Sequence, residues 1–176
     1  MKSPAPFKLR AAEPRDVPAI VGLIRELAEF EKLTHLVKVT PESLMPQLFG
    51  ARPAAEALVV EVGEVGEEGG EGEATEVAAF ALFFTNFSTF LGLPGIYLED
   101  LYVRPAHRGS GLGTTLLTRL AQIAVERGCG RFEWSVLDWN ENAIRFYKSM
   151  GADVMTEWQI CRVTGERLAR LGAAAA

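Results

Sequence analysis

Apolar residues recur along this chain in two spacings, one typical of helices and one of strands. Over residues 112–127 apolar residues recur three to four positions apart, as on one face of a helix, at Leu112, Leu116, Leu120 and Ile123. Residues 96–103 are apolar or aromatic except for two adjacent acids, which favours a buried strand. The two segments are adjacent, so a strand leads directly into a long helix.

The same patterns predict the other elements. Strands are expected at residues 7–10, 57–62, 77–84, 96–103 and 131–136, with one or two more antiparallel strands within 152–163. A first helix is announced by Pro14, Asp16 and Pro18 and extends to Phe30, and further helices are expected at 41–50, 112–127, 140–151 and 166–171. Thr40 followed by Pro41 is a helix start signal, and Asn140 is a plausible cap. The order predicts a mixed α/β sheet. Residues 63–73, acidic and rich in glycine, are expected to form a mobile hairpin loop.

A glycine-rich stretch, Arg108-Gly109-Ser110-Gly111-Leu112-Gly113, joins this strand to this helix. The first N–H groups of a helix lack partners within it and carry the positive end of its dipole, so they attract anions such as phosphate. The alternative is a turn that only connects two elements. A P-loop is excluded because Thr114 and Thr115, not Lys, follow the last glycine, and the dinucleotide fingerprint needs a different spacing.

Composition narrows the class of protein. With 176 residues, 48% of them apolar, the chain is expected to form one domain with a substantial core. The net charge of -5 argues against nucleic acid as a partner and is compatible with a cationic substrate. No apolar run approaches the ~20 residues that span a bilayer, and no signal-peptide pattern is present. Cys129 and Cys161 lack metal or redox spacing, so buried free thiols, a cytoplasmic location and no metal are expected.

Three stretches resemble the GNAT (Gcn5-related) N-acetyltransferases. The loop at 108–113 has the spacing of their acetyl-CoA loop, and Asn140 to Ala152 resembles their asparagine-led helix ending in F-Y-x-x-x-G. Residues 97–100 and 25–31 are similar to the branch that contains diamine, polyamine (spermidine/spermine-type) and thialysine acetyltransferases. The resemblance covers nearly the whole chain.

The resemblance implies a fold and a co-substrate. The fold is a mixed, mostly antiparallel central sheet with splayed parallel strands, flanked by helices, in a single N-acetyltransferase domain over residues 1–176. Acetyl-CoA would lie between the strands at 96–103 and 131–136. The residues that the resemblance assigns to it are Leu101, Tyr102, Val103, Arg108, Gly109, Ser110, Gly111, Leu112, Gly113, Thr114, Asn140 and Lys148. The branch also implies a homodimer to which C-terminal strands contribute.

Acetyl transfer to an amine needs an oxyanion donor, a base and an acid. The backbone N–H of Leu101 is the oxyanion candidate, exposed where the strands splay. Side chains alternate along a strand, so only one of Glu99 and Asp100 is expected to face the site, and the family pattern selects Glu99 as general base. Asp100 would take part only if a local irregularity turned it inward. Tyr147 is the candidate acid for the leaving thiolate, with a role as core filler as the alternative.

The acceptor site is expected at the end of the first helix. The family's aromatic and acidic substrate-binding pair falls on Phe30 and Glu31, and a carboxylate beside a ring suits an ammonium. The alternative is an acidic, solvated helix end. Residues 86–90 lack the acid that polyamine-specific relatives carry there, which favours short diamines, thialysine-like amino acids or other small amines. His35 and Trp139 are further candidates for lining the pocket.

The resulting hypothesis is an acetyl-CoA-dependent N-acetyltransferase that acetylates a primary amine of a small molecule by direct transfer in a ternary complex. Neither cysteine has a neighbouring base in sequence, which disfavours a covalent acetyl-enzyme route. Two alternatives remain open: an acetyltransferase for protein N-termini or lysines, and a non-catalytic acyl-CoA-binding sensor.

Overall fold

The computed structural model describes residues 6–63 and 76–173 of the chain. They fall into two compact units, Met1–Ser135 and Val136–Ala176, and each unit is described by itself. The first unit contains the sheet and three of the α-helices, and the second contains the remaining two.

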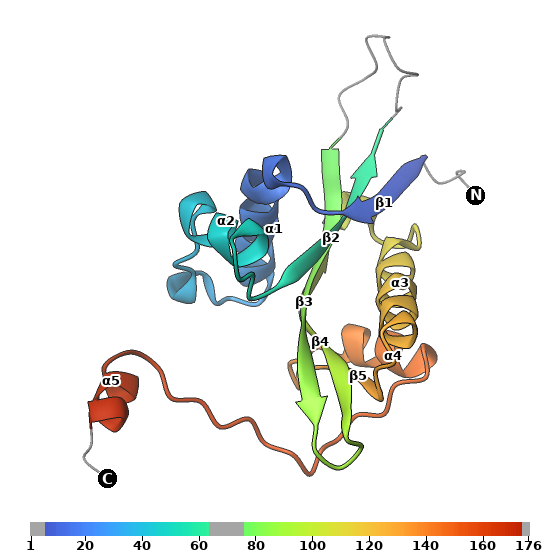
Figure 1. The fold of residues 1–176 in the computed structure, drawn as a ribbon. Coiled ribbons are helices and arrows are strands. Elements are labelled where there is room, and N and C mark those ends of the chain that lie inside the picture. The colour runs from blue at the N-terminus through green and yellow to red at the C-terminus, as the bar shows by residue number, and fades with distance from the viewer. Residues whose placement is uncertain (1–5, 64–75, 174–176) are drawn as a thin grey trace. The chain divides into compact units, whose positions relative to one another are not determined.

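The first unit is built on a five-stranded sheet whose spatial order follows the chain (Figure 1). Its strands are β1 (Phe7–Ala11), β2 (Glu56–Val62), β3 (Glu76–Ser88), β4 (Leu93–Val103) and β5 (Arg131–Trp134). The first four pair antiparallel, and β5 pairs parallel with β4. The mixed, mostly antiparallel sheet predicted from the sequence is therefore confirmed.

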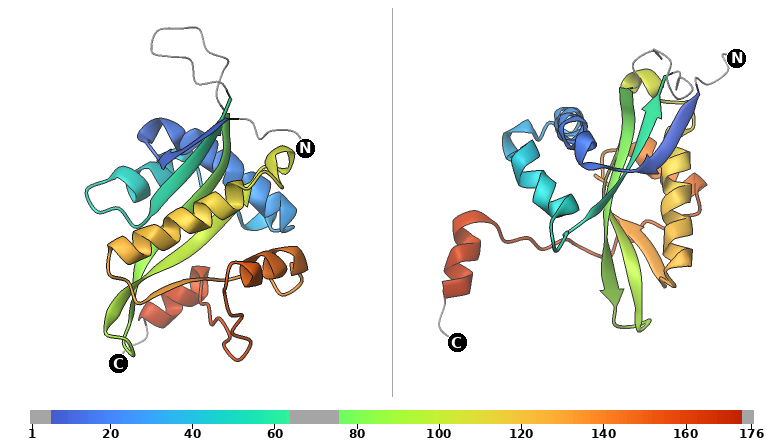
Figure 2. Two further views of the ribbon diagram at one scale, coloured as in Figure 1. Left: turned by 90° about the vertical axis from the view of Figure 1, so that its right-hand side faces the viewer. Right: turned by 45° about the horizontal axis from the view of Figure 1, so that its top comes forward.

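Helices cover both faces of this sheet (Figure 2). The helices α1 (Val17–Phe30) and α2 (Pro41–Phe49) pack together on one face, and α3 (Leu112–Glu126) packs against β3, β4 and β5 on the other. Short 3₁₀ turns stand at Pro14–Asp16, Thr34–Leu36 and Pro105–His107. One core cluster lies between α1, α2 and the sheet, and its buried members are Val17, Ile20, Val21, Leu23, Leu44, Leu48, Ala57, Val59, Phe80 and Tyr102.

The predicted helix signals operate as expected. The Thr40 side chain accepts a hydrogen bond from the Ser43 backbone N–H, and the Ser43 hydroxyl accepts one from the Thr40 N–H, a reciprocal cap for α2. The helix α3 ends at Glu126, and Gly128 follows with φ of 65°. A left-handed residue after a helix is the conformation that glycine adopts without strain.

Two features of β4 shape the site. Opposite β3, Leu82 pairs with Asp100 while Phe83 pairs with Leu98, so Glu99 is an extra residue and forms a β-bulge. Pairing with β5 ends at Leu98 and Trp134, whereas β4 continues to Val103. Beyond Leu98, β4 is therefore bonded to β3 alone, which agrees with the expected splay of the parallel strands.

The second unit contains α4 (Glu141–Ser149) and α5 (Gly165–Ala173). The Asn140 side chain caps α4 by accepting a hydrogen bond from the Ala143 N–H at 3.2 Å. The strands predicted within 152–163 are wrong, because these residues carry no regular structure. Trp158 and Ile160 are each 68% exposed. A strand forms only where its backbone finds a partner strand, and the described residues of the chain provide none for this segment.

Several boundaries differ from the prediction. The strands β3 and β4 are longer than expected, and β5 is shorter. Of the predicted hairpin loop at 63–73, residues 64–73 lie outside the described part of the chain. Cys129 and Cys161 are free thiols as expected, but Cys129 is only half-buried and Cys161 is exposed, so the prediction of two buried thiols is wrong. None of the helices formed by the described residues combines the length and the apolar composition that a membrane span requires.

Candidate active site

The glycine loop enters α3 through two left-handed glycines. Gly109 has φ of 77°, and Gly111, the N-cap of α3, has φ of 90°. A Cβ built on either glycine would meet no atom within 4 Å, so the backbone is open on that side. The first turn of the 15-residue helix α3 contains no acidic residue. Open N–H groups at the positive end of a helix form a site for an anionic group such as a pyrophosphate.

Arg108, just before the loop, points toward the end of α1. Its guanidinium carbon lies 5.0 Å from the centroid of the Phe30 ring and 5.5 Å from that of the Tyr102 ring. Its Nε donates a hydrogen bond to the Val103 carbonyl at 3.0 Å. The family resemblance assigns Arg108 to acetyl-CoA, and the structure adds a cation–π contact with Phe30, the predicted acceptor-site aromatic.

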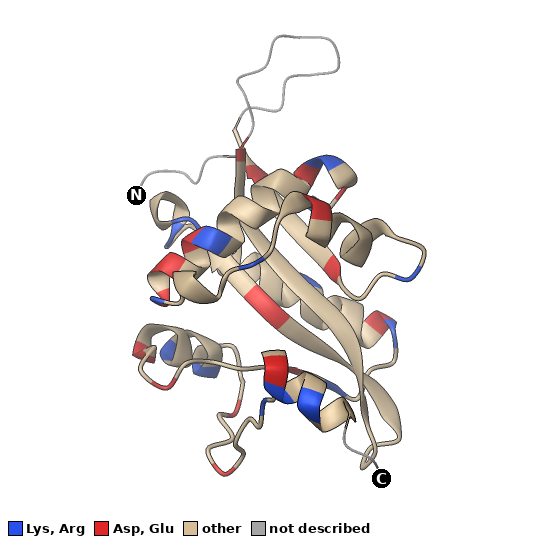
Figure 3. Cartoon of the chain, turned by 90° about the vertical axis from the view of Figure 1, so that its left-hand side faces the viewer, with Lys and Arg blue, Asp and Glu red and all other residues tan. Residues whose placement is uncertain are grey.

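The acidic residues of the site come from two elements, the end of α1 and the strand β4. Glu31 is the C-cap of α1, and Asp100 lies on the same sheet face as the core residue Tyr102, two positions further along β4. Figure 3 shows an acidic stretch midway along a strand of this sheet. Burial, together with the charges of Glu99 and Glu31, raises the pKa of Asp100 to about 6, and burial raises the pKa of Glu31. Both carboxyls thus lie where charge is poorly solvated, and a cation there would be stabilised.

The β-bulge changes what the sequence predicts for Glu99 and Asp100. Strict alternation places the two carboxylates on opposite faces, but the extra residue at Glu99 interrupts it. This is the irregularity under which Asp100 was expected to take part. Glu99 itself is exposed, and its charge contributes to the raised pKa of Asp100. Asp100 is therefore a stronger site candidate than sequence alone indicates, and the available signal was the adjacent pair of acids.

A second basic residue, Arg104, precedes the 3₁₀ turn Pro105–His107 that leads into the loop, and it contacts two other elements. Its guanidinium donates to Glu26 on α1 from Nε at 3.1 Å and to Glu76 at the start of β3 from Nη1 at 3.0 Å. His107 Nε2 lies 2.6 Å from the other oxygen of Glu76, and this hydrogen bond is the main cause that lowers the pKa of Glu76. The Ser110 hydroxyl donates to the His107 carbonyl. Sequence reasoning missed this network because its members are distant along the chain.

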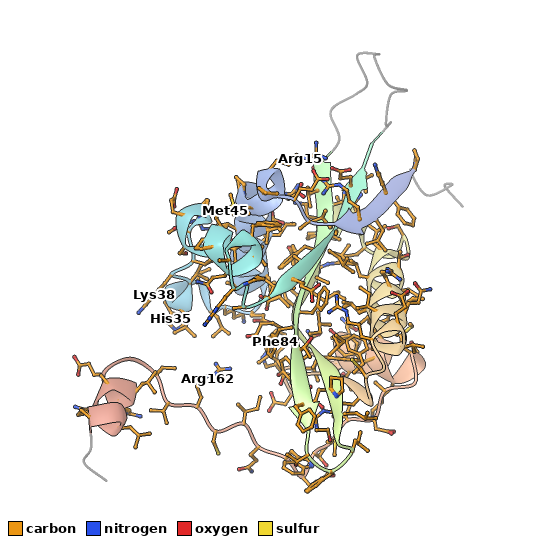
Figure 4. All side chains as sticks on the ribbon, viewed as in Figure 1. Arg15, His35, Lys38, Met45, Phe84 and Arg162 are labelled. Atoms are coloured by element: carbon orange, nitrogen blue, oxygen red, sulfur yellow. The ribbon has the colours of Figure 1, made fainter. Side chains whose placement is uncertain are left out.

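The structure brings most of the predicted residues of the first unit into one region. Leu101, Tyr102 and Val103 lie on the part of β4 that β5 does not pair, and Leu112, Gly113 and Thr114 form the first turn of α3. His35 is exposed in the connection between α1 and α2, where Figure 4 shows it on the same segment as Lys38.

The remaining predicted residues belong to the second unit. Asn140 caps α4, and Tyr147 and Lys148 lie in its last turns. The Tyr147 ring is half-buried, and its centroid lies 5.5 Å from that of the Phe146 ring. Trp139, just before α4, is exposed. Within the described residues, no group of three or more His, Cys, Asp or Glu side chains is arranged to hold a metal ion.

The strand β4 continues past its parallel neighbour and leads through a glycine loop into a helix N-terminus, an arrangement that suits an anionic ligand. Residues 25–152 match the model of the acetyltransferase (GNAT) family, and the chain belongs to this family. It is an N-acetyltransferase by family and by its relatives, and members of the family use acetyl-CoA.

Curated relatives align over nearly the whole chain. The chain is 39% identical over 170 residues to the thialysine N-epsilon-acetyltransferase of Mus musculus, covering 95% of this chain and 98% of the relative. It is 38% identical over 195 residues to the L-ornithine N5-acetyltransferase NATA1 of Arabidopsis thaliana, covering 92% and 86%.

Solved structures share the fold at lower sequence identity. An integron cassette protein from V. cholerae superposes with a TM-score of 0.73 at 24% identity, over 96% of this chain and 98% of the other. An aminoglycoside acetyltransferase from a soil metagenome superposes with a TM-score of 0.69 at 18% identity, over 90% and 97%. These two likenesses support the fold assignment alone.

Proposed function

We propose that the protein transfers the acetyl group of acetyl-CoA to a primary amine of a small molecule, directly within a ternary complex. The observation that carries the proposal is the acidic cluster of Glu31, Glu99 and Asp100. Glu31 caps the end of α1, and Glu99 and Asp100 lie on β4, the strand that leads toward the glycine loop. A cationic amine fits such a cluster. The relatives named for thialysine and L-ornithine acetylation act on amines of this kind.

The loop residues fit acetyl-CoA. The backbone of Gly109, Ser110 and Gly111, with the first turn of α3 through Thr114, would hold its pyrophosphate, and Arg108 adds a positive charge beside them. Leu101, Tyr102 and Val103 would hold its pantetheine arm along the unpaired stretch of β4. We assign Asn140 and Lys148 further contacts with the same molecule. When bound, acetyl-CoA supplies the activated acetyl group.

Proton removal from the substrate is the costly step for the protein. A free alkyl amine with a pKa of about 10.4 is mostly protonated at pH 7, and removing its proton at that pH costs roughly 4.6 kcal/mol. We assign Glu99 as the base, acting directly or through water, and Asp100 and Glu31 as the groups that bind the ammonium, with Phe30 as its aromatic wall. The pKa of Asp100 near 6 keeps this carboxyl ionised at neutral pH.

The other two roles fall to Leu101 and Tyr147. The Leu101 N–H would donate to the developing oxyanion. The phenol of Tyr147 would supply the proton for the leaving thiolate, since a positioned phenolic O–H can act as a general acid.

The substrate class follows from the acids that are present and from one that is missing. Residues 86–90 run Asn-Phe-Ser-Thr-Phe and contain no carboxylate, so a long polycation would find no partner in this segment. We therefore favour short diamines and amino acids with an aminoalkyl side chain, such as thialysine or ornithine, over spermine.

The remaining properties concern the whole chain. We propose one acetyltransferase domain over residues 1–176, because the family match crosses the boundary between the two compact units. We also propose a cytoplasmic homodimer. The apolar Met155, Trp158 and Ile160, each more than half exposed, support an assembly in which the C-terminal segment finds its partner strand in a second copy. Sedimentation of a monomer at micromolar concentration would contradict it.

The test is release of free thiol from acetyl-CoA with a panel of putrescine, spermidine, spermine, thialysine, ornithine, lysine and a short peptide. We expect the highest kcat/KM with thialysine or ornithine. Turnover of the peptide alone would instead assign a protein acetyltransferase. A Tyr147→Phe variant should lose turnover about 100-fold while its CoA affinity, measured by calorimetry, stays the same; unchanged turnover would remove Tyr147 from the mechanism.

A further inference from the structure

Two arginines, one on each side of the 3₁₀ turn Pro105–His107 that leads into the glycine loop, contact the last turns of α1. Arg104 and Arg108 are four residues apart, and so are their partners on α1, Glu26 and Phe30, which therefore lie on one face of the helix. Arg104 contacts Glu26 through Nε at 3.1 Å and Nη2 at 3.0 Å. Arg108 lies 5.0 Å from the Phe30 ring. We name these two contacts the arginine brace.

The brace is anchored at its loop end. The Arg104 backbone N–H donates to the Ala78 carbonyl at 3.0 Å, and its Nη1 is paired with Glu76, so Arg104 is fixed to β3 as well as to α1. Arg108 is fixed through its Nε to the Val103 carbonyl. The Arg104 and Glu26 side chains are 29% and 35% exposed, which makes their fork partly desolvated and stronger than a fully solvated surface pair.

We propose that the arginine brace couples the two substrate sites, so that binding of acetyl-CoA at the loop and binding of the amine at the end of α1 strengthen each other. This rests on the proposed function for both sites. The brace holds the residues on either side of the turn at Pro105–His107, from which the glycine loop continues, and it holds Phe30 against β4. Glu26 and Arg104 are positioning residues here, since neither is assigned to either substrate.

The physical basis of the coupling is the fraction of molecules in which the glycine loop has the geometry that binds CoA. If the loop is held in its anion-binding geometry for only part of the time, the apparent affinity for CoA falls by that fraction. Loss of either contact to α1 lowers that fraction without removing any group that touches CoA. Linkage then requires that the amine and CoA affect each other's affinity by the same factor.

The experiment measures the Kd of CoA by calorimetry, without amine, in variants changed only on α1. We expect Phe30→Leu and Glu26→Gln each to weaken CoA binding about threefold, and the double variant about tenfold. Matched controls are Phe49→Leu, an aromatic of similar exposure at the end of α2, and Glu29→Gln on α1, and both should bind CoA as the wild type does. Melting temperatures of all variants verify folding.

A kinetic arm tests the reciprocal effect with the best amine of the panel. Arg104→Gln should raise the KM of the amine about threefold with kcat unchanged, and Arg104→Lys should restore part of it. Wild-type CoA affinity in both Phe30→Leu and Glu26→Gln would overturn the coupling while leaving the proposed function in place. Failure of the wild type to bind CoA would overturn the proposed function and the coupling with it.

Discussion

The two halves of the candidate active site differ in the groups that form them: backbone in one half and side chains in the other. The cofactor half, residues 108–114, is formed by backbone: two glycines with positive φ, a helix N-terminus and open space beside both glycines. The acceptor half, comprising Phe30, Glu31, Glu99 and Asp100, is formed by side chains that a bulge and a helix end bring together. Under the proposed function, the first half would recognise the charge and shape that CoA esters share, and the second half would select the amine.

This difference has consequences for mutation. Backbone N–H groups are the same for every residue, so the cofactor half should tolerate side-chain changes that preserve its dihedral angles. The acceptor half depends on single carboxylates whose ionisation is set by burial and by each other. We therefore expect its variants to show the larger effects and the stronger dependence on pH.

The largest effects are expected from the adjacent acids of β4. Glu99→Gln should lower kcat/KM about 100-fold, mostly through kcat, because it removes the assigned base. Asp100→Asn should lower kcat/KM about tenfold, mostly through the KM of the amine, since it removes a charge that binds the ammonium. Steady-state kinetics of the two isosteric variants distinguish these roles.

The pH dependence sharpens the same comparison. Asp100 must be ionised to bind a cation, so the wild-type KM of the amine should rise as the pH falls through about 6, while Asp100→Asn should lack this rise. A large loss of kcat in Asp100→Asn, with a small one in Glu99→Gln, would reverse the assignment and make Asp100 the base.

A backbone change should produce an intermediate effect in the cofactor half. Gly111→Ala places a Cβ on a residue with φ of 90°, a strain of about 1–2 kcal/mol, although no neighbouring atom would clash. The loop should relax away from its anion-binding shape, and the Kd of CoA should rise about tenfold. Gly22→Ala, within α1 and also free of clashes, is the control and should leave the Kd unchanged. Equal affinity in both variants would mean that the left-handed geometry is not needed.

The same contrast explains what could be predicted from the sequence. The cofactor half was predictable because glycine spacing next to a periodic apolar helix determines a backbone conformation locally. The contact of Arg104 with Glu26 in the arginine brace was not predictable, because no local pattern relates residues 78 positions apart. The bulge at Glu99 could not be located from the sequence, although a local irregularity there was considered, because it depends on how β3 and β4 pair.

Two further elements show where local signals fail. The apolar residues of 152–163 have strand propensity, but propensity alone forms no strand where the described chain offers no partner edge. Arg108 was assigned to acetyl-CoA, and predicting its contact with Phe30 would have required knowledge of where α1 ends in space. In both cases the missing information was tertiary.

The smallest expected effect concerns stability and has the opposite sign to the effect on activity. The pKa of Asp100 rises from 3.8 to about 6 on folding, so the folded state binds this proton more tightly than the unfolded state does. Wild-type stability should therefore fall as the pH rises from about 4 to 6, and the loss should persist above pH 6. Asp100→Asn avoids it, since an amide does not ionise.

We expect Asp100→Asn to be more stable than the wild type by about 1–2 kcal/mol at pH 7.5, and to lose this advantage near pH 4. Urea denaturation at both pH values measures the difference in free energy of unfolding between the variant and the wild type. The titration of groups that the two proteins share cancels in this difference. Glu99→Gln, at an exposed neighbour, should change stability far less. If Asp100→Asn were instead less stable than the wild type at pH 7.5, favourable contacts of the ionised carboxylate would outweigh the cost of burying its charge. A stabilised but impaired variant would identify the acceptor half as the part of the molecule where stability is given up for amine binding.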